Sequence, residues 1–133
     1  MRALLIPLGD DVYAVPVAAA REVVSDPRPT PVPTAPACIR GLLNVRGDIV
    51  PLLDLGILLG AAPAGSCTYA VVVDTAVGRG ALVATALPEV GELAEVVAAP
   101  ELPGALAVHR SGARLVTLLD LDTVLDPARI GGA

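Results

Sequence analysis

The sequence predicts an all-β fold built from small barrels. Its 133 residues include 13 Gly and 13 Pro, which break the chain into short apolar runs. These runs have the length and composition of strands, and helical periodicity is hard to find. Many short strands with Gly- and Pro-containing turns are typical of small barrels. Hydrophobic residues make up 54% of the chain, but without Phe or Trp the core must come from Val, Leu, Ile and Ala.

Turn-forming residues pair several of these runs into hairpins. The predicted strands, in chain order, are residues 2–8, 12–17, 22–24, 41–45, 49–53, 69–74, 80–87, 96–97, 106–109 and 114–119. Polar turns join three pairs of them, at Gly9-Asp10-Asp11, Arg46-Gly47-Asp48 and Ser111-Gly112. Gly78-Arg79-Gly80 is predicted to be a further hairpin turn, since it is too short for a phosphate cradle and precedes a strand rather than a helix.

A proline series separates the third predicted strand from the fourth. Prolines recur from Pro27 to Pro36, and each lacks the backbone donor that a central strand needs. We therefore expect an extended crossing over the body of the protein. Pro31-Val32-Pro33 would also suit an SH3-type domain as a ligand, but a rigid connector is the simpler interpretation.

One motif occurs twice. Leu52-Leu53-Asp54-Leu55 recurs as Leu118-Leu119-Asp120-Leu121, in both cases after a Gly-containing turn. Asp54 and Asp120 are predicted N-caps of short helices. Chance repetition is the alternative, because Leu and Asp are common in this sequence, but the repeated motif favours two similar subdomains. The predicted division of the chain is residues 1–60, a small-residue linker 60–66, and residues 67–133.

Charge and hydropathy exclude several function classes. The formal net charge is −5, so a nucleic-acid backbone would repel the chain, and aromatic platforms for base stacking are missing. No apolar run reaches the ~18 residues of a membrane span, so we expect no membrane insertion and a cytoplasmic location.

Residues capable of catalysis or metal binding are few. Cys38 and Cys67 are expected to be free thiols, and without a C-x-x-C pair a zinc site is not predicted. His109, the only histidine, precedes a turn and is expected at a strand end on the surface. Asp120 and Asp122 would need further ligands to hold Mg²⁺, so capping is the better interpretation of Asp120. We expect no enzyme, no cofactor and no metal site.

A small set of polar residues stands among the apolar strands. Asn44 and Arg46 alternate, which predicts that they share one strand face, with Leu43 and Val45 on the other. Spacing alone allows a solvated face, an ion pair between Glu22 and Arg46, or a binding contact at a turn beside a rigid sheet.

The arrangement of these residues resembles the CheW-like domains. Residues 12–17 and 21–24 resemble the opening strands of that family. The similarity is most specific from Pro33 to Leu55, with a proline-bounded crossing, Gly41, an Asn-x-Arg-Gly turn and an apolar Pro-containing strand that ends in Asp-Leu. It covers nearly the whole chain, strongly over residues 12–59 and more loosely after residue 75.

The resemblance implies a fold, a function and two partners. The fold is two five-stranded, SH3-like β-barrels around a shared core, with short helices. The function is a non-catalytic adaptor between methyl-accepting chemoreceptors and a CheA-like histidine kinase. One face would bind the regulatory domain of the kinase, and a groove between the subdomains would bind the cytoplasmic tip of the receptor.

The resemblance also implies site residues. By position, Glu22 and Arg46 match polar contact residues of the family, with Gly41 and Asn44 supporting the turn and Gly47 within it. The second half carries few charged strand residues, so we expect a chiefly apolar second interface. Its candidate residues are Val71, Val73 and Leu82. Because strand residues alternate sides, some of the three are expected to belong to the core and the others to the surface.

Two departures and two alternatives accompany this prediction. Thr85 stands where the family commonly has Asp, and the segment 97–106 is shorter than usual, so the second interface is the less specific part. One alternative is a coupling protein of a pathway unrelated to motility. The other is a small enzyme that uses Cys38 or His109, against which the lone histidine counts.

Overall fold

Eleven strands in two sheets account for most of the structure. The computed structural model describes residues 1–132. The strands are β1 (Arg2–Leu8), β2 (Asp11–Pro16), β3 (Ala20–Ser25), β4 (Ile39–Val45), β5 (Asp48–Leu53), β6 (Tyr69–Thr75), β7 (Gly78–Ala84), β8 (Glu89–Glu92), β9 (Val96–Ala98), β10 (Ala105–Ser111) and β11 (Arg114–Leu119). The helical segments are a 3-10 turn (Val17–Ala19), α1 (Leu55–Leu58), α2 (Leu121–Val124) and α3 (Pro127–Gly131). The all-β prediction is confirmed, and none of the helices in residues 1–132 has the length and hydropathy of a membrane span.

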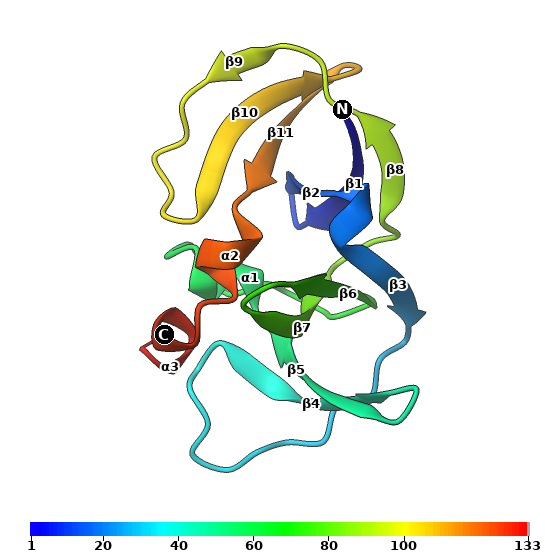
Figure 1. Ribbon diagram of the computed structural model, residues 1–133, viewed down its shortest axis with the longest axis vertical. Coiled ribbons are helices and arrows are strands. Elements are labelled where there is room, and N and C mark those ends of the chain that lie inside the picture. The colour runs from blue at the N-terminus through cyan, green and yellow to red at the C-terminus, as the bar shows by residue number, and fades with distance from the viewer. Residues whose placement is uncertain (133) are drawn as a thin grey trace.

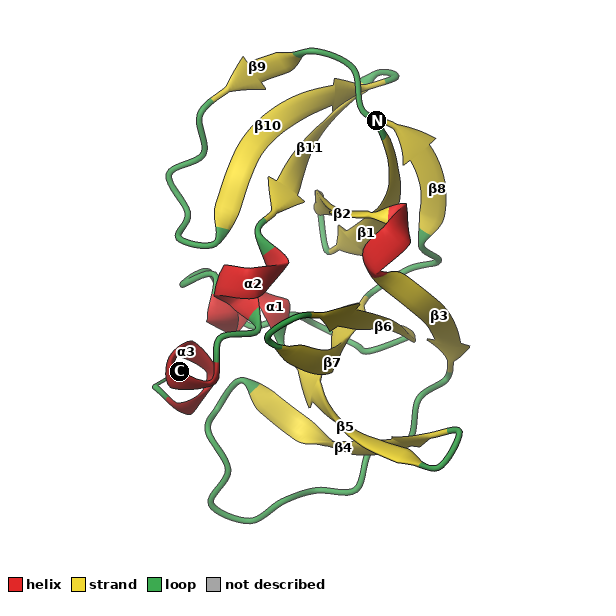
Figure 2. Cartoon of the chain, in the orientation of Figure 1, coloured by secondary structure: helices red, strands yellow, loops and turns green. Residues whose placement is uncertain are grey.

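The two sheets lie one above the other, with α1 and α2 beside the junction (Figures 1 and 2). One sheet, here called sheet A, has six strands in the order β8-β1-β2-β11-β10-β9. The other, sheet B, has five in the order β3-β6-β7-β5-β4. The expected count of five strands therefore holds for sheet B, while β9 extends sheet A by one edge strand.

The sheets do not follow the predicted division at residues 60–66. Sheet B uses one continuous stretch, β3 to β7, whereas sheet A combines the β1–β2 hairpin with β8 to β11. The chain thus leaves sheet A at the 3-10 turn (Val17–Ala19) and returns to it after β7. Each sheet contains a hairpin from one predicted half and strands from the other.

The repeated Leu-Leu-Asp-Leu motif has the same surroundings in both sheets. β5 and β11 each pair antiparallel with the preceding strand across a bulge, and each pairs in parallel with another strand, β7 or β2. The amides of Asp54 and Asp120 then donate to the carbonyls of Cys38 and Gly104, at 2.7 and 2.8 Å. A four-residue helix follows in each case.

The two aspartates nevertheless differ in what their side chains do. Asp54 is nearly fully buried, and its carboxylate accepts from the amides of Ile57 and Ala64 and from the Arg40 guanidinium. Asp54 is therefore the predicted cap and also an anchor for the loop after α1. Asp120 occupies the N-cap position, but within residues 1–132 its side chain caps no amide and instead accepts from the Thr123 hydroxyl at 2.9 Å. The prediction of a side-chain cap at Asp120 is wrong.

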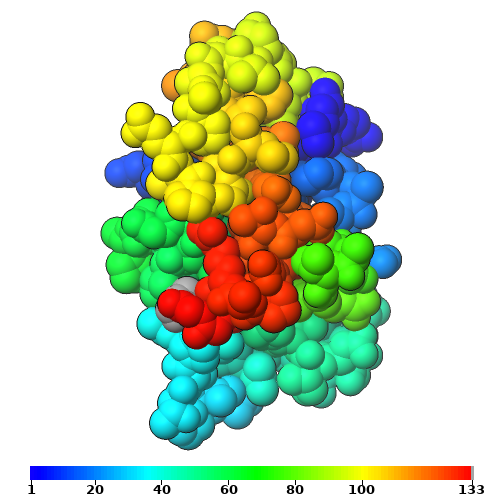
Figure 3. Space-filling view, turned by 60° about the vertical axis from the view of Figure 1, so that its left-hand side comes forward, coloured from blue at the N-terminus to red at the C-terminus, as the bar shows by residue number. Residues whose placement is uncertain are grey.

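Most of the buried aliphatic side chains form a shared core between the sheets. This core contains residues of β1 and β2 together with nearly all the buried residues of sheet B. A second, smaller cluster fills sheet A with Ala3, Leu5, Ala14, Leu93, Val116 and Leu118. β1 is therefore buried on both faces and links the two clusters, while the proline crossing (cyan) lies at the lower end of the molecule (Figure 3).

Candidate functional site

The β4–β5 turn places an exposed arginine, Arg46, at the edge of sheet B. Its two central residues, Arg46 and Gly47, have φ angles of +52° and +88°. Two positive φ angles are the signature of a type I′ turn, which prefers Asn-Gly because left-handed backbone is unfavourable for most side chains. The Asn44 side-chain oxygen accepts from the Gly47 amide at 2.9 Å and so stabilises the turn.

Arg46 forms an ion pair with Glu22 on β3. Its Nε donates to Oε1 of Glu22 at 3.0 Å. The Glu22 side chain is 28% exposed, whereas that of Arg46 is 82% exposed. The ion-pair interpretation is confirmed, but the prediction that Asn44 and Arg46 share a strand face is wrong, because β4 ends at Val45 and Arg46 lies in the turn.

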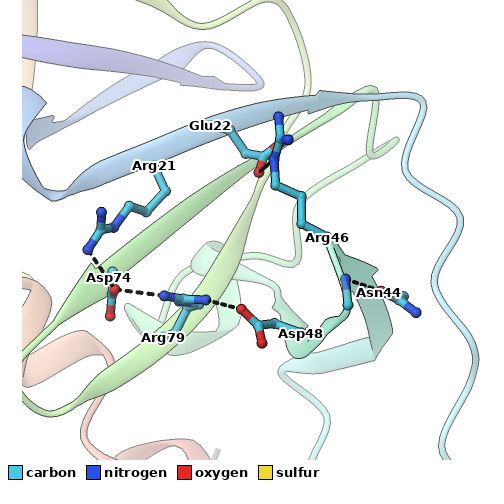
Figure 4. Close-up of polar contacts among 8 residues, drawn as sticks. Arg21, Glu22, Asn44, Arg46, Asp48, Asp74 and Arg79 are labelled. Carbon is cyan, nitrogen blue, oxygen red and sulfur yellow. Dashed lines mark hydrogen bonds and ion pairs between the residues drawn. The ribbon is translucent and has the colours of Figure 1, made fainter.

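A chain of ion pairs continues from this turn across sheet B (Figure 4). Arg79 on β7 donates to Asp48, at the base of the turn, at 2.6 Å and to Asp74 on β6 at 3.0 Å. Arg21 on β3 donates to the same Asp74 carboxylate at 3.1 Å. The sequence analysis missed this chain, although opposite charges at Asp74 and Arg79, at the two ends of a predicted hairpin, were a usable signal.

These charges surround a shallow depression. It has a volume of about 290 Å³ and is lined by Arg21, Glu22, Val45, Arg46, Asp48, Val72 and Arg79. Hydrogen bonds from Arg79 and Arg21 lower the pKa of Asp74, and the Asp74 carboxylate raises the pKa of Arg79. The Asp74–Arg79 pair therefore stays charged at neutral pH, and Val45 and Val72 contribute the apolar part of the lining.

Gly41 has a different role from the one predicted. It is buried in β4, with φ +151°, beneath the proline crossing. A Cβ at this position would lie 2.7 Å from the carbonyl oxygen of Thr30 and 2.8 Å from the Pro29 side chain. Thr30 and Leu42 also exchange backbone hydrogen bonds. Gly41 therefore allows the crossing to pack on β4, and it does not support the turn.

The residues predicted for a second interface lie inside the protein. Val71, Val73 and Leu82 are each 0% exposed and belong to the shared core. They sit on β6 and β7, two inner strands of sheet B whose apolar runs are covered on both faces. The prediction that some of these three residues are exposed at a second interface is wrong, because all three belong to the core.

Most of the exposed large apolar side chains of the second half belong instead to sheet A and its loops, with Val77 in the β6–β7 turn of sheet B as an exception. Those more than half exposed are Leu87, Val90, Val96, Leu106 and Leu115. Thr85, the predicted departure from the family pattern, lies beside the first hairpin. Its backbone amide donates to Pro7, and its hydroxyl oxygen accepts from the Gly9 amide at 2.9 Å.

The thiols and the histidine have backbone partners. Within residues 1–132 both cysteines are free, with Cys38 Sγ donating to the Ile130 carbonyl and Cys67 Sγ to that of Tyr69. Burial raises the pKa of both thiols, the opposite of what activates a nucleophile. His109 Nδ1 lies 2.8 Å from the Ala94 carbonyl oxygen in sheet A. The described residues 1–132 bring no three His, Cys, Asp or Glu side chains together as a metal site.

Comparison with known proteins identifies similar sequences and a similar fold. The family described as "CheW-like domain" matches residues 2–129. The chain is similar to "Probable chemotaxis protein CheW" of Rhizobium etli, with 32% identity over 72 residues, which cover 54% of this chain and 46% of the relative. It is also similar to "Chemotaxis protein CheW" of Treponema pallidum, with 33% identity over 48 residues, or 36% of this chain and 28% of the relative. The matched segments thus span less than half the length of these curated relatives.

A solved structure has the same fold. The scaffolding protein TtCheW from Thermoanaerobacter tengcongensis superimposes with a TM-score of 0.75, over 89% of this chain and 87% of that one. The sequence identity of the pair is 20%, so this likeness concerns the fold alone. It agrees with the SH3-like architecture expected from the sequence.

Proposed function

Because the chain belongs to the family of CheW-like domains, we propose that it is a non-catalytic adaptor that couples methyl-accepting chemoreceptors to a CheA-type histidine kinase. The receptor tip and the kinase both lie in the cytoplasm, so the proposal includes a cytoplasmic location for the adaptor. The observation that carries the proposal is the β4–β5 turn, where an arginine occupies a backbone conformation that suits Asn or Gly and projects into solvent. Unfavourable local backbone of this kind often marks a functional contact.

We assign the receptor contact to this turn, and not to the groove between the subdomains that the resemblance implied. Glu22 holds the Nε edge of the Arg46 guanidinium, and within the described residues the terminal nitrogens have no acceptor and are available to a partner. A guanidinium edge with two parallel donors fits a carboxylate, so the receptor tip would present Asp or Glu to it. Asn44 and Gly47 maintain the turn, and Gly41 contributes indirectly by seating the proline crossing.

The kinase contact is assigned to sheet A. Its exposed apolar residues, among them Val90, Val96 and Leu115, supply the apolar surface that the buried residues of β6 and β7 cannot. Contacts on opposite sheets would let one molecule bind both partners together, as an adaptor must.

A three-component binding experiment tests this function. The full chain is mixed with the cytoplasmic tip fragment of a receptor and the regulatory domain of the kinase from the same organism, and the mixture is separated by size. We expect a complex of all three proteins. If receptor fragment and kinase domain displace each other, the adaptor mechanism is overturned and a single-site regulator of the kinase is the better description.

A further inference from the structure

The tip of the β4–β5 hairpin extends beyond the backbone pairing that holds it to sheet B. β5 pairs with β7 at Leu52 and Leu53, and Asp48 lies four residues before this ladder. On its other side, β4 is an edge strand. The orientation of the tip relative to the sheet therefore depends on side chains.

Two ion pairs supply that connection. One joins Arg46 to Glu22 on β3, and the other joins Asp48 to Arg79 on β7. Arg79 is itself fixed by Asp74, its cross-strand neighbour on β6. The tip is thus tied to strands on two sides of the depression, and Figure 4 shows the line of contacts from Arg21 through Asp74 and Arg79 to Asp48.

The contacts of Arg79 differ from those of Arg46 in one respect. The Arg79 guanidinium is engaged by two carboxylates, through Nη1 and Nη2. Within residues 1–132 the side chain of Arg46 makes a single hydrogen bond, through Nε. Arg46 therefore has donors available to a partner, whereas both terminal nitrogens of Arg79 already donate to carboxylates, one of which, Asp48, lies at the base of the turn.

We propose that Arg79 is a positioning residue for receptor binding: through Asp48 it holds the β4–β5 turn so that Arg46 meets a carboxylate of the receptor tip. The inference rests on the proposed function, since it requires Arg46 to be the contact. Its physical basis is preorganisation, because a turn that is already oriented loses less conformational freedom on binding.

The test compares Arg79→Met with Arg46→Asn in the full chain, using the receptor cytoplasmic tip fragment as the probe. We expect Arg46→Asn to weaken binding about tenfold or more. Arg79→Met removes exposed ion pairs and should weaken binding by about two- to fivefold, with nearly unchanged Tm. Asp48→Asn should reproduce the effect of Arg79→Met. The matched control is Arg110→Met, which removes an exposed ion pair with Glu95, at 3.0 Å in sheet A, and should leave receptor affinity unchanged.

Two further measurements separate positioning from a general structural role. Added to Arg46→Asn, Arg79→Met should cause no further loss of affinity, because the residue it positions is gone. Amide hydrogen exchange at Gly47 should be faster in Arg79→Met than in the wild type and unchanged in Arg110→Met. Independent, multiplying effects of the two substitutions on affinity would overturn the inference, as would unchanged exchange at Gly47.

The outcomes also separate this inference from the proposed function. If Arg46→Asn binds the receptor fragment like the wild type, the receptor contact itself is misplaced. If Arg46→Asn weakens binding and Arg79→Met does not, the contact stands and the positioning role of Arg79 is wrong.

Discussion

At the scale of single residues, Arg46 combines an unfavourable backbone with an exposed charge. Asn tolerates the left-handed conformation and is preferred before Gly in a type I′ turn. Arg46→Asn loses one exposed ion pair, worth about 0.2–1 kcal/mol, and relieves backbone strain of about 1–2 kcal/mol. We therefore expect the free energy of unfolding to stay constant or rise by about 1 kcal/mol while receptor affinity falls. Denaturant unfolding beside the binding assay checks this, and a large loss of stability would make Arg46 a structural residue.

Asp74 gives the charged face a defined response to acid. Its folded-state pKa lies below the ordinary value of 3.8, so its carboxylate stabilises the fold above the unfolded-state pKa. This stabilisation is lost as the pH falls through the lower, folded-state pKa. Carboxyl NMR titration should give a midpoint below 3.8 in the wild type and one closer to 3.8 in Arg79→Met. A wild-type midpoint at or above that value contradicts the geometry of the ion pairs.

The packing of the proline crossing on Gly41 predicts that a larger side chain at this position lowers the stability of the fold. Alanine at this position combines an unfavourable φ of +151° with a contact of 2.7 Å to the Thr30 carbonyl oxygen. Relief requires the crossing to lift from β4, so Gly41→Ala should destabilise the fold by about 1–3 kcal/mol. Gly47→Ala is the control, since a Cβ there meets open space and only the φ of +88° is unfavourable. Thermal unfolding of the two variants should rank Gly41→Ala as the less stable.

At the scale of elements, the two Leu-Leu-Asp-Leu motifs offer an internal comparison. Asp54→Ala removes a buried carboxylate that receives bonds from two amides and from Arg40, so it should cost about 2–4 kcal/mol. Asp120→Ala loses one bond from a hydroxyl and no amide cap within the described residues, so the expected loss is below about 1 kcal/mol. Equal losses in chemical denaturation would contradict the difference between the two sites.

Sequence patterns predicted the elements that local chemistry determines. The hairpins at Gly9, Arg46 and Ser111 follow from turn residues between apolar runs, and the Asp54 cap follows from its position before an apolar turn. β8 (Glu89–Glu92) was missed because its sequence, EVGE, has low β-propensity. Its glycine, Gly91, leaves room for the Leu5 side chain, whose terminal methyl would lie 2.7 Å from a Cβ at this position, and this closeness depends on the pairing of β8 with β1.

Side-chain exposure on β6 and β7 was harder to predict. Val71-Val72-Val73 is a continuous apolar run, and such a run belongs to a strand covered on both faces. An expectation of alternating sides instead placed some of these residues on the surface. The ion-pair chain from Arg21 to Asp48 depends on four strands meeting in one sheet, which no local pattern specifies.

At the scale of the whole molecule, the two proposed interfaces should respond differently to salt. The receptor contact through Arg46 is electrostatic and should weaken as ionic strength rises, because exposed charges are screened over roughly 8–10 Å near physiological salt. The kinase contact on sheet A is apolar and should change little. Affinities for each partner at low and high salt check this, and a strongly salt-dependent kinase affinity would contradict the assignment to exposed residues such as Val90 and Leu115.

The path of the chain between the sheets determines which fragments can fold. Sheet A needs β1 and β2 from the start of the chain and β10 and β11 from its end, joined by parallel pairing of β2 with β11. The predicted halves, residues 1–60 and 67–133, each contain an incomplete set of strands for both sheets. The repeated motif suggested two self-contained halves. A local motif identifies similar elements, but it does not show which strands pair with one another, and here the strands of both halves share each sheet.

This topology predicts the behaviour of fragments. Residues 1–60 alone and 67–133 alone should show no cooperative unfolding, because the hairpins in each half lack the strands from the other half that complete their sheets. Mixed together, they should recover the circular dichroism of the intact chain, since all eleven strands are then present. Residues 20–85, which contain every strand of sheet B, are the control and should retain strand structure at reduced stability, because the Leu4, Ile6 and Tyr13 side chains of the shared core are absent. A cooperative transition in either half alone, near the Tm of the intact chain, would mean that each half forms a complete sheet of its own and that the interlaced topology is wrong.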